Sequence, residues 1–395
     1  MPRSHARLSP SSASRWLRCP ASVQFIEDEA IEDEGGVAAN QGSILHDICE
    51  QCLRSTAISP YSFVGETMEY EGTTLEITEL HADEIQKGLD YIDEIEGRLF
   101  VEKRLDLGRW MPGQFGTMDV GIIGQKRVTI FDWKWGYIPV QAVDNDQMRI
   151  YALGFWDKYV RKQYPHIRKF RLIIWQPFAP GGGGEWDIDL DDLLDFGDQL
   201  IKIAKTTYRK DAPFVPGDKQ CAYCPAAKNL VCEAYKKFNL DMLIDDEDAI
   251  DEEIEMGIPL RMANTKHMSP ERRSHILQHR SMINKFLDRL AAEELDDALK
   301  GRPTPGRKAV DGRSPARKYT DKEEAEREIT LILPDEEAYT RKLISPTQLE
   351  KVVSEKTYRR LEKRLIDRGE PKPVMVPVGD RRPAKQTLLA ELDED

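Results

Sequence analysis

Asp119, Asp132 and Lys134 carry the side chains best suited to chemistry near the middle of this chain. Asp119 ends "GQFGTMD", Asp132 lies 13 residues later in "TIFDWKWG", and Lys134 follows at i+2. Residues i and i+2 of a strand share a face, and a hairpin can bring the two carboxylates to one end of a sheet. Such oxygen ligands suit Mg²⁺ or Mn²⁺, which polarises a phosphoryl oxygen and acidifies a bound water. A plain Asp132–Lys134 salt bridge is the alternative.

Other side chains could join this site. Lys134 can position or deprotonate the attacking water, or stabilise phosphate charge. Glu102 in "LFVEKRL" is a candidate further ligand or support on a neighbouring strand. Gln147 and Tyr151 are four apart, hence on one helix face. His46 in "GSILHDICE" could supply a neutral imidazole as a third ligand. Each of these residues alone also has a structural explanation, as a surface pair or a packed side chain.

The elements that must position these residues follow from the hydrophobic period. A change from helical spacing to strand-like runs after residue 97 predicts helices before a sheet, with turns at Gly113, Gly116 and 124–126. The predicted helices are 41–54, 80–97, 144–163 and 191–209, and the predicted strands are 99–107, 113–125, 127–136, 169–177 and 185–190.

The order of the candidate residues resembles the RecB-like branch of the PD-(D/E)XK nuclease superfamily. The matching motifs are Gly42-x-x-x-His46, Gly116-x-x-Asp119, Asp132-x-Lys134 and Gln147-x-x-x-Tyr151, and the resemblance covers residues 10–237. It implies an α/β fold of restriction-endonuclease-like type, with an αβββαβ core whose mixed central sheet is flanked by helices. It also implies Mg²⁺-dependent cleavage of DNA phosphodiester bonds.

The resemblance assigns a role to each matching residue. It implies that His46, Asp119 and Asp132 bind metal and that Lys134 acts in catalysis. Gln147 and Tyr151 match the helix motif that orients the lysine or the DNA, and Glu102 matches the acid of the first core strand. The acid of the third motif is Asp where many relatives have Glu, a substitution that the superfamily accepts.

Cysteines suggest a second site. Cys221, Cys224 and Cys232 form C-x2-C-x7-C, and Cys19 in "WLRCP" is the natural fourth ligand. One cysteine before the core and three after it resemble the iron–sulfur staple of AddB-type and CRISPR-associated relatives, which implies a [4Fe–4S] cluster. Zinc in the same four thiolates is the competing interpretation. Cys49 and Cys52 lie among apolar helix positions and are predicted to be core residues.

The composition limits the classes of protein to which the chain can belong. The chain has 395 residues, a net charge of −13, 40% hydrophobic and 32% charged residues. The overall charge is unfavourable for nucleic-acid binding, so any DNA contact needs a local basic surface or a metal site. Neither a transmembrane helix nor a secretory signal is expected, which predicts no membrane partner and a cytoplasmic location, in the host if the chain is phage-encoded.

We expect three regions. Residues 1–240 would form the nuclease domain with its cysteine cluster, 241–268 an acidic linker, and 269–395 a polar, mostly helical extension with a partly disordered tail. The layout resembles phage-encoded proteins found beside recombination genes. That implies an exonuclease acting with a single-strand annealing or recombination protein. The alternatives are a non-catalytic DNA-binding or assembly module and a structure-specific endonuclease.

Overall fold

The computed structural model describes residues 6–32, 36–243 and 269–300, together with Arg302, Glu355 and Arg359. The chain divides into two compact units, Met1–Arg302 and Pro303–Asp395. In the second unit the described residues are Glu355 and Arg359, which form an i,i+4 ion pair of 2.5 Å. The predicted acidic linker and most of the predicted C-terminal extension therefore lie outside the described residues.

A five-stranded mixed sheet forms the centre of the first unit. Its order is β3-β4-β5-β6-β7, and only the β5–β6 pair is parallel. A parallel pair needs a crossover connection, which helix α5 supplies. Because α4 precedes β3, the chain order is the predicted αβββαβ, and the predicted fold class is confirmed. The strands are β3 (Arg98–Asp106), β4 (Phe115–Ile123), β5 (Arg127–Trp133), β6 (Lys169–Trp175) and β7 (Gly184–Asp189).

Helices and short elements surround this sheet, and α5 continues into a π-helical turn. They are η1 (Pro10–Ser12), α1 (Ala13–Trp16), α2 (Ala21–Asp28), α3 (Val37–Arg54), η2 (Pro60–Phe63), the β1 (Thr67–Tyr70) and β2 (Thr73–Glu76) hairpin, α4 (Glu79–Asp93), α5 (Asp146–Phe155), η3 (Trp156–Val160), α6 (Leu190–Thr206), α7 (Asp218–Ala222), α8 (Pro225–Lys228), α9 (Glu233–Leu243), α11 (Pro270–Gln278) and α12 (Arg280–Leu299). Among the described residues, no helix has both the length and the hydrophobicity needed to cross a membrane.

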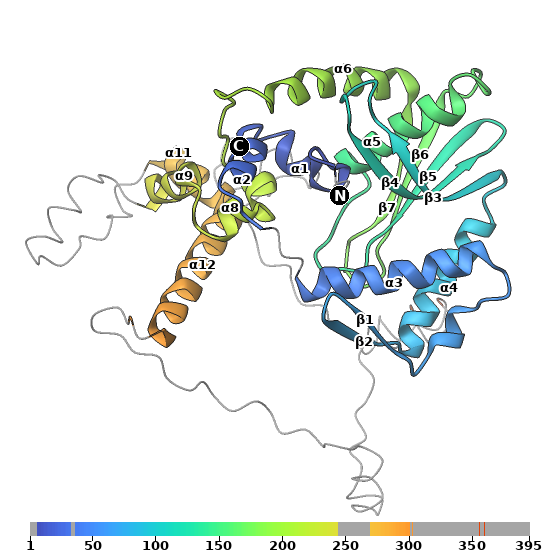
Figure 1. Cartoon of the computed structure of the whole chain (residues 1–395), viewed down its shortest axis with the longest axis horizontal. Coiled ribbons are helices and arrows are strands. Elements are labelled where there is room, and N and C mark those ends of the chain that lie inside the picture. Colours follow the sequence, from blue (N-terminus) through green and yellow to red (C-terminus); the bar gives the residue numbers. More distant parts are fainter. Residues whose placement is uncertain are drawn as a thin grey trace, which may run out of the picture. The chain divides into compact units, whose positions relative to one another are not determined.

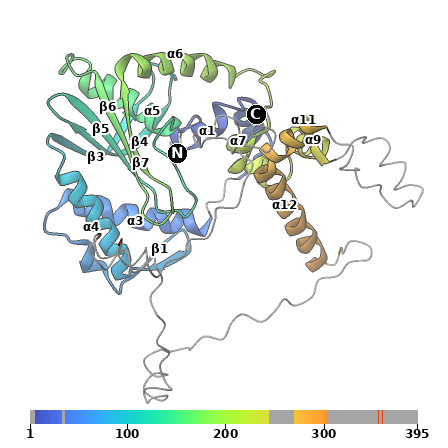
Figure 2. The same cartoon turned by 180° about the vertical axis from the view of Figure 1, so that it is seen from behind.

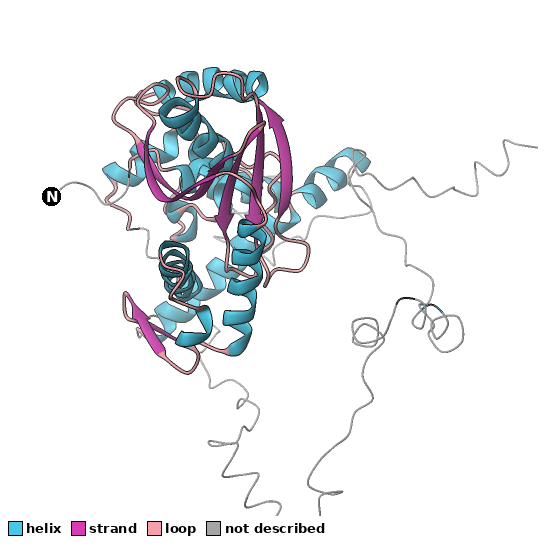
Figure 3. Ribbon diagram, turned by 90° about the vertical axis from the view of Figure 1, so that its right-hand side faces the viewer, coloured by secondary structure: helices cyan, strands magenta, loops and turns pink. Residues whose placement is uncertain are grey.

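Side-chain alternation along β5 builds a core on each face of the sheet. Val128 and Ile130 are buried in one cluster with residues of α5 and α6. Phe131 and Trp133 are buried in the other with residues of α3 and α4. Figures 1 and 2 show α5 and α6 on one side of the strands and α3 and α4 on the other, and Figure 3 shows helices on both sides of the sheet. The sheet is thus covered on both faces, as its apolar strands require.

Gly116 lies inside β4, so the turn predicted at this position is wrong. It pairs with Leu105 of β3. A Cβ atom built on Gly116 would lie 2.6 Å from Cγ of Pro10 and 3.0 Å from Cε1 of Tyr151. The glycine therefore permits a close approach of η1 and α5 to the strand rather than a change of chain direction.

The cysteine segment forms a third buried cluster next to the sheet domain. Cys221 and Cys224 share this cluster with Tyr235 of α9 and with Met282 and Phe286 of α12. Helices α11 and α12 thus begin the region that we predicted as a separate extension, and α12 packs directly on the cysteine segment. The predicted boundaries near residues 240 and 268 adjoin residues outside the described set and stay predictions.

Candidate active site

Asp119 and Asp132 lie opposite each other on β4 and β5. The antiparallel register pairs Val120 with Phe131, and these two aspartates are the next residues along the strands. The backbone N–H of Trp133 donates a hydrogen bond of 2.9 Å to Oδ2 of Asp119, which fixes that carboxylate against the neighbouring strand. Asp132 is 1% exposed. The meeting of the two carboxylates expected from the hairpin is therefore present.

Lys134 directly follows β5 and turns toward Asp132. Its Nζ lies 2.8 Å from Oδ2 of Asp132, and its backbone N–H donates to the carbonyl of Trp175 on β6 at 2.8 Å. Burial works to lower the pKa of Lys134, but the charges of Asp132 and Asp119 outweigh it and raise the pKa above its ordinary value. The lysine is therefore protonated at neutral pH and places a positive charge at the carboxylates.

Gln147 and Tyr151 of α5 face the same carboxylates. Gln147 Nε2 donates to Oδ1 of Asp132 at 3.3 Å and to the hydroxyl of Tyr151 at 3.2 Å. Asn145 caps the helix by accepting from the backbone N–H of Met148 at 3.1 Å, which sets where the helix begins. The hydrogen bonds of Gln147 thus reach an aspartate and the tyrosine, where the family resemblance had offered the lysine or the DNA as targets.

His46 of α3 lies close to Asp119. Its Nδ1 is 3.5 Å from Oδ2 of Asp119. Burial, followed by the positive charge of Lys134, lowers the pKa of His46 to about 4, although the charge of Asp132 opposes the change. The imidazole is consequently neutral at physiological pH. A neutral ring nitrogen is the form of histidine that binds metals.

Glu102 is a strained residue opposite Asp119. The register pairs Val101 with Val120 and Lys103 with Met118, so Glu102 stands across from Asp119 between them. Its φ is +47°, a left-handed conformation that is uncommon for a residue other than glycine. Backbone strain of this kind concentrates at functional sites. Burial, and then the charge of Glu50, raises the pKa of Glu102 to about 7, with Asp132 adding to the effect and Arg54 opposing it.

The donor set fits a divalent cation. Burial, and then the charge of Asp132, raises the pKa of Asp119 well above its usual range, and a bound cation would offset both by favouring the ionised carboxylate. Two carboxylates and a neutral imidazole are ligands that Mg²⁺ or Mn²⁺ accept. Among the described residues, no three His, Cys, Asp or Glu side chains are grouped closely enough to hold a metal ion as they stand. Binding would therefore require Lys134 and His46 to adjust around the carboxylates.

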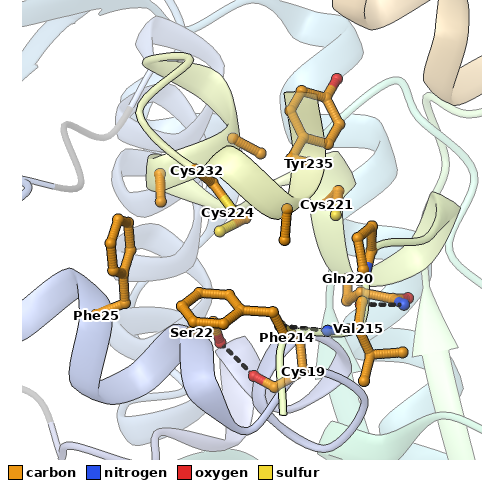
Figure 4. A pocket seen from close by; sticks show the side chains of 14 residues that line it. Cys19, Ser22, Phe25, Phe214, Val215, Gln220, Cys221, Cys224, Cys232 and Tyr235 are labelled. Atoms are coloured by element: carbon orange, nitrogen blue, oxygen red, sulfur yellow. Dashed lines mark hydrogen bonds between the residues drawn. The ribbon is translucent and has the colours of Figure 1, made fainter. Parts of the chain in front are cut away.

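Four cysteines from distant parts of the chain line one pocket. Cys19 follows α1, Cys221 lies in α7, Cys224 precedes α8 and Cys232 precedes α9. The pocket surrounds about 350 Å³, and Figure 4 shows the four side chains on different sides of it, with Phe25 and Tyr235 among the other lining residues. All four are free thiols. The four cysteines that the sequence predicted as one ligand set thus line one pocket, but among the described residues no three of them are grouped closely enough to hold a metal ion as they stand.

Two backbone N–H groups reach sulfur atoms of this pocket, and burial keeps the thiols protonated as long as no metal is bound. Burial raises the pKa of Cys19 and Cys232, and raises that of Cys221 to about 12. The backbone N–H of Val215 donates to Sγ of Cys19 at 3.3 Å, and that of Gly217 donates to Sγ of Cys221 at 3.4 Å. Hydrogen bonds of this type tune the thiolate ligands of iron–sulfur clusters.

The two remaining cysteines lie elsewhere. Cys49 and Cys52 are buried in the core between α3 and the sheet, as packing residues would be. Their burial raises the pKa of both thiols, so they stay protonated. Neither lines the pocket that the other four cysteines share.

Several supporting residues escaped the sequence analysis. Asp146 is buried and accepts ion pairs from Arg18 at 2.5 Å and from Arg149 at 2.7 Å. Gln176 uses its amide to hold the loop that joins Lys134 to Gln147. The signal for Asp146 is its place beside Gln147 on a helix that is buried along its length. Gln176 carries no local signal, because its partners lie about 40 residues away in the sequence.

The fold and the site define an α/β protein of the nuclease-like type with a carboxylate–lysine centre. The chain belongs to the family described as "Protein of unknown function (DUF2800)", whose model matches residues 5–383.

Two solved structures resemble the chain distantly. A crystal structure of SSO0001 is 14% identical, with 57% of this chain and 85% of that chain covered and a TM-score of 0.27. A structure described as a candidate exonuclease from Eubacterium rectale is 11% identical, with 51% and 82% covered and a TM-score of 0.27. Likenesses of this strength are too weak to bear on the function of this chain.

Proposed function

We propose that the chain is a divalent-cation-dependent deoxyribonuclease of the RecB-like PD-(D/E)XK type. The observation that carries the proposal is the meeting of Asp119 and Asp132 on neighbouring strands, with Nζ of Lys134 2.8 Å from the Asp132 carboxylate. Burial, and then the charge of Asp132, raises the pKa of Asp119, and a divalent cation at the two acids would favour the ionised form of both. Mg²⁺ is the cation that we propose, with Mn²⁺ as the alternative.

Each residue then has a defined part. When bound, the cation would polarise the phosphate and acidify a water molecule. His46, Asp119 and Asp132 would hold the cation. Lys134, kept protonated by its acidic neighbours, would stabilise negative charge on the phosphate and position the attacking water.

The residues around these groups would keep them in place. Gln147 fixes the orientation of Asp132 through its amide, and the hydroxyl of Tyr151 fixes the amide of Gln147. Glu102, opposite Asp119 in the sheet, would support the site from β3. Because these hydrogen bonds exist before substrate binds, little reorganisation is needed when charge develops on the phosphate.

We also propose that Cys19, Cys221, Cys224 and Cys232 bind a [4Fe–4S] cluster, with structural Zn²⁺ as the alternative. The shared pocket and the backbone N–H groups that donate to two of the sulfur atoms support this proposal. Cys19 and Cys221 are 202 residues apart, so a shared ligand would restrict a long segment of the unfolded chain. The role would be structural.

The substrate that we propose is linear DNA cut from an end. A structure-specific endonuclease would use the same residues, and a non-catalytic binding module would retain them without cleavage. A closed circular substrate separates the first two activities, because only an endonuclease opens it. A phage setting with a single-strand annealing or recombination protein as partner stays a prediction from the family resemblance.

The direct test is cleavage by the purified full-length protein. Linear duplex and single-stranded DNA are incubated with and without Mg²⁺, using wild type, Asp132→Ala and the exposed-residue control Asp198→Ala. We expect Mg²⁺-dependent loss of linear DNA with wild type and with Asp198→Ala, and at least a hundredfold less with Asp132→Ala. Intact DNA with wild type, or equal cleavage by Asp132→Ala, would contradict the proposal.

A further inference from the structure

The loop between Lys134 and Gln147 exposes an unusual amount of apolar surface. Tyr137 is 70% exposed, Ile138 60% and Val143 51%. In the chain these side chains lie between Lys134 and Gln147, two residues of the candidate site. A contiguous patch of exposed apolar side chains usually marks a binding surface.

The backbone of this loop is held firmly in place. Gln176, at the end of β6, donates through Nε2 to the carbonyls of Gly136 and Ile138, each at 2.8 Å. Its Oε1 accepts from the backbone N–H of Val140 at 2.7 Å. One buried amide thus fixes three points of the loop, so Tyr137 is presented to solvent from a rigid support.

Tyr137 is the outermost ring of an aromatic series. Its ring stacks on Phe178 with centroids 6.1 Å apart and an interplanar angle of 30°. Phe178 contacts Trp135 at 5.8 Å, and Trp135 stacks on Trp133 at 5.7 Å and 8°. The series runs from the core strand β5 to the surface, where it ends at Tyr137. The exposed ring of Tyr137 can stack on another flat ring.

A pocket opens beside these rings. It is lined by Tyr137, Phe178 and Trp135, together with Gln41 and Gly42 of α3. Gly42 and His46 are one helical turn apart, about 6 Å along the helix axis. Trp135 directly follows Lys134, and its indole N–H is buried and has no acceptor among the described residues. The pocket thus includes the residue that follows Lys134 and lies one helical turn from His46, and it offers aromatic faces and the Gln41 amide.

We propose that this pocket binds one unpaired nucleobase of the strand whose phosphate lies at Asp119 and Asp132. A nucleobase has the flat π surface that Tyr137 and Phe178 can stack on, and edge groups that the Gln41 amide can pair with. A base inside a duplex is covered on both faces, so only a single strand or an opened end can deliver one. The substrate class is therefore single-stranded nucleic acid at the point of cleavage. This inference rests on the proposed function for the position of the phosphate.

Binding of a labelled single strand tests this inference without relying on cleavage. A fluorescein-labelled twelve-nucleotide strand is titrated with full-length protein in EDTA, and its anisotropy is recorded. The variants are Tyr137→Ala, Tyr137→Phe, which keeps the ring, and Tyr70→Ala, which removes an exposed tyrosine of β1. We expect about tenfold weaker binding for Tyr137→Ala, equivalent to about 1.4 kcal/mol. Tyr137→Phe and Tyr70→Ala should bind within about twofold of wild type.

The outcomes separate this inference from the proposed function. Equal binding by Tyr137→Ala and wild type, or no binding of the single strand by wild type, overturns the base pocket even if wild type cleaves DNA. Tyr137-dependent binding by a protein that cleaves nothing upholds the pocket while the nuclease proposal fails.

Discussion

Arg18 and Asp146 form an ion pair that joins the two candidate sites. Nη1 of Arg18 lies 2.5 Å from Oδ2 of Asp146, whose side chain is 7% exposed. Arg18 precedes Cys19, and Asp146 precedes Gln147, so the pair connects the neighbour of a proposed cysteine ligand with the neighbour of an amide of the candidate active site. The position of helix α5, which carries Gln147 and Tyr151, is thereby tied to the N-terminal segment.

Replacing Arg18 should therefore damage the site from a distance. In Arg18→Gln, Asp146 keeps Arg149 but loses its partner from the turn after α1, and a buried charge that loses a partner destabilises the fold. We expect a loss of about 1–3 kcal/mol in unfolding free energy, measured by urea titration, and several-fold slower DNA cleavage. Arg209→Gln removes an exposed pair with Asp211 and should leave the unfolding free energy almost unchanged. Equal effects of the two substitutions would contradict this account.

Asp119→Asn should stabilise the metal-free protein and weaken cation binding. The carboxylate is buried beside Asp132, and both burial and that charge oppose its ionisation, so a neutral amide should raise the unfolding temperature without added metal. Mg²⁺ at about 100 times its dissociation constant should stabilise wild type by about 2.7 kcal/mol and the variant hardly at all. Thermal unfolding with and without Mg²⁺ measures both. A Mg²⁺ effect that survives in Asp119→Asn would count against the ligand assignment.

Glu102 should make stability depend on pH. Burial and Glu50 raise its pKa from 4.5 to about 7 in the folded state. Between these values the folded chain holds a proton that the unfolded chain has released, so its contribution to stability falls as pH rises from about 4.5 to 7. Glu102→Gln should match wild type near pH 4.5 and exceed it by about 1–2 kcal/mol near pH 8, after allowance for solvent screening.

Urea unfolding at several pH values, followed by tryptophan fluorescence, measures this difference. The control is Glu94→Gln, since Glu94 is exposed after α4. If the unfolding free energies of wild type and Glu102→Gln change with pH in parallel, Glu102 is not the source of the pH dependence.

The cysteine pocket should give the protein a colour. Protein purified without oxygen should be brown and contain about four iron atoms per chain if the pocket holds a [4Fe–4S] cluster. Cys224→Ser should bleach the sample, while Cys52→Ala, a core cysteine outside the pocket, should keep the colour. Absorption spectra and metal analysis provide the measurement. A colourless protein with one zinc per chain would decide for the alternative ligand.

Much of this fold could be predicted from the sequence because local patterns determine it. The strand that ends in Trp133 alternates between two cores, and the helix of Ile85 and Ile92 shows regular apolar spacing. Gly116 was misjudged because its reason is long-range: the ring of Pro10 and the ring of Tyr151 leave no room for a side chain.

The candidate site also combines features that follow from local sequence patterns with features that depend on long-range packing. The sequence could predict that Asp119 and Asp132 lie opposite each other, because a hairpin fixes which residues of its two strands are neighbours. The positive φ of Glu102 and the ion pair from Arg18 to Asp146 could not be predicted, because both depend on how distant segments pack. The bonds of Gln176 to the loop belong to the same group.

The central claim is that Asp119, Asp132 and Lys134 form a metal-dependent nuclease centre. It is tested most directly by digestion of linear DNA labelled at its 5′ or its 3′ end, with Mg²⁺, comparing wild type with Lys134→Ala. Wild type should release the label progressively from one end, and Lys134→Ala should be at least a hundredfold slower while still showing the Mg²⁺-induced rise in unfolding temperature. Cleavage by Lys134→Ala at the wild-type rate, or no Mg²⁺-dependent release by wild type, would contradict the account.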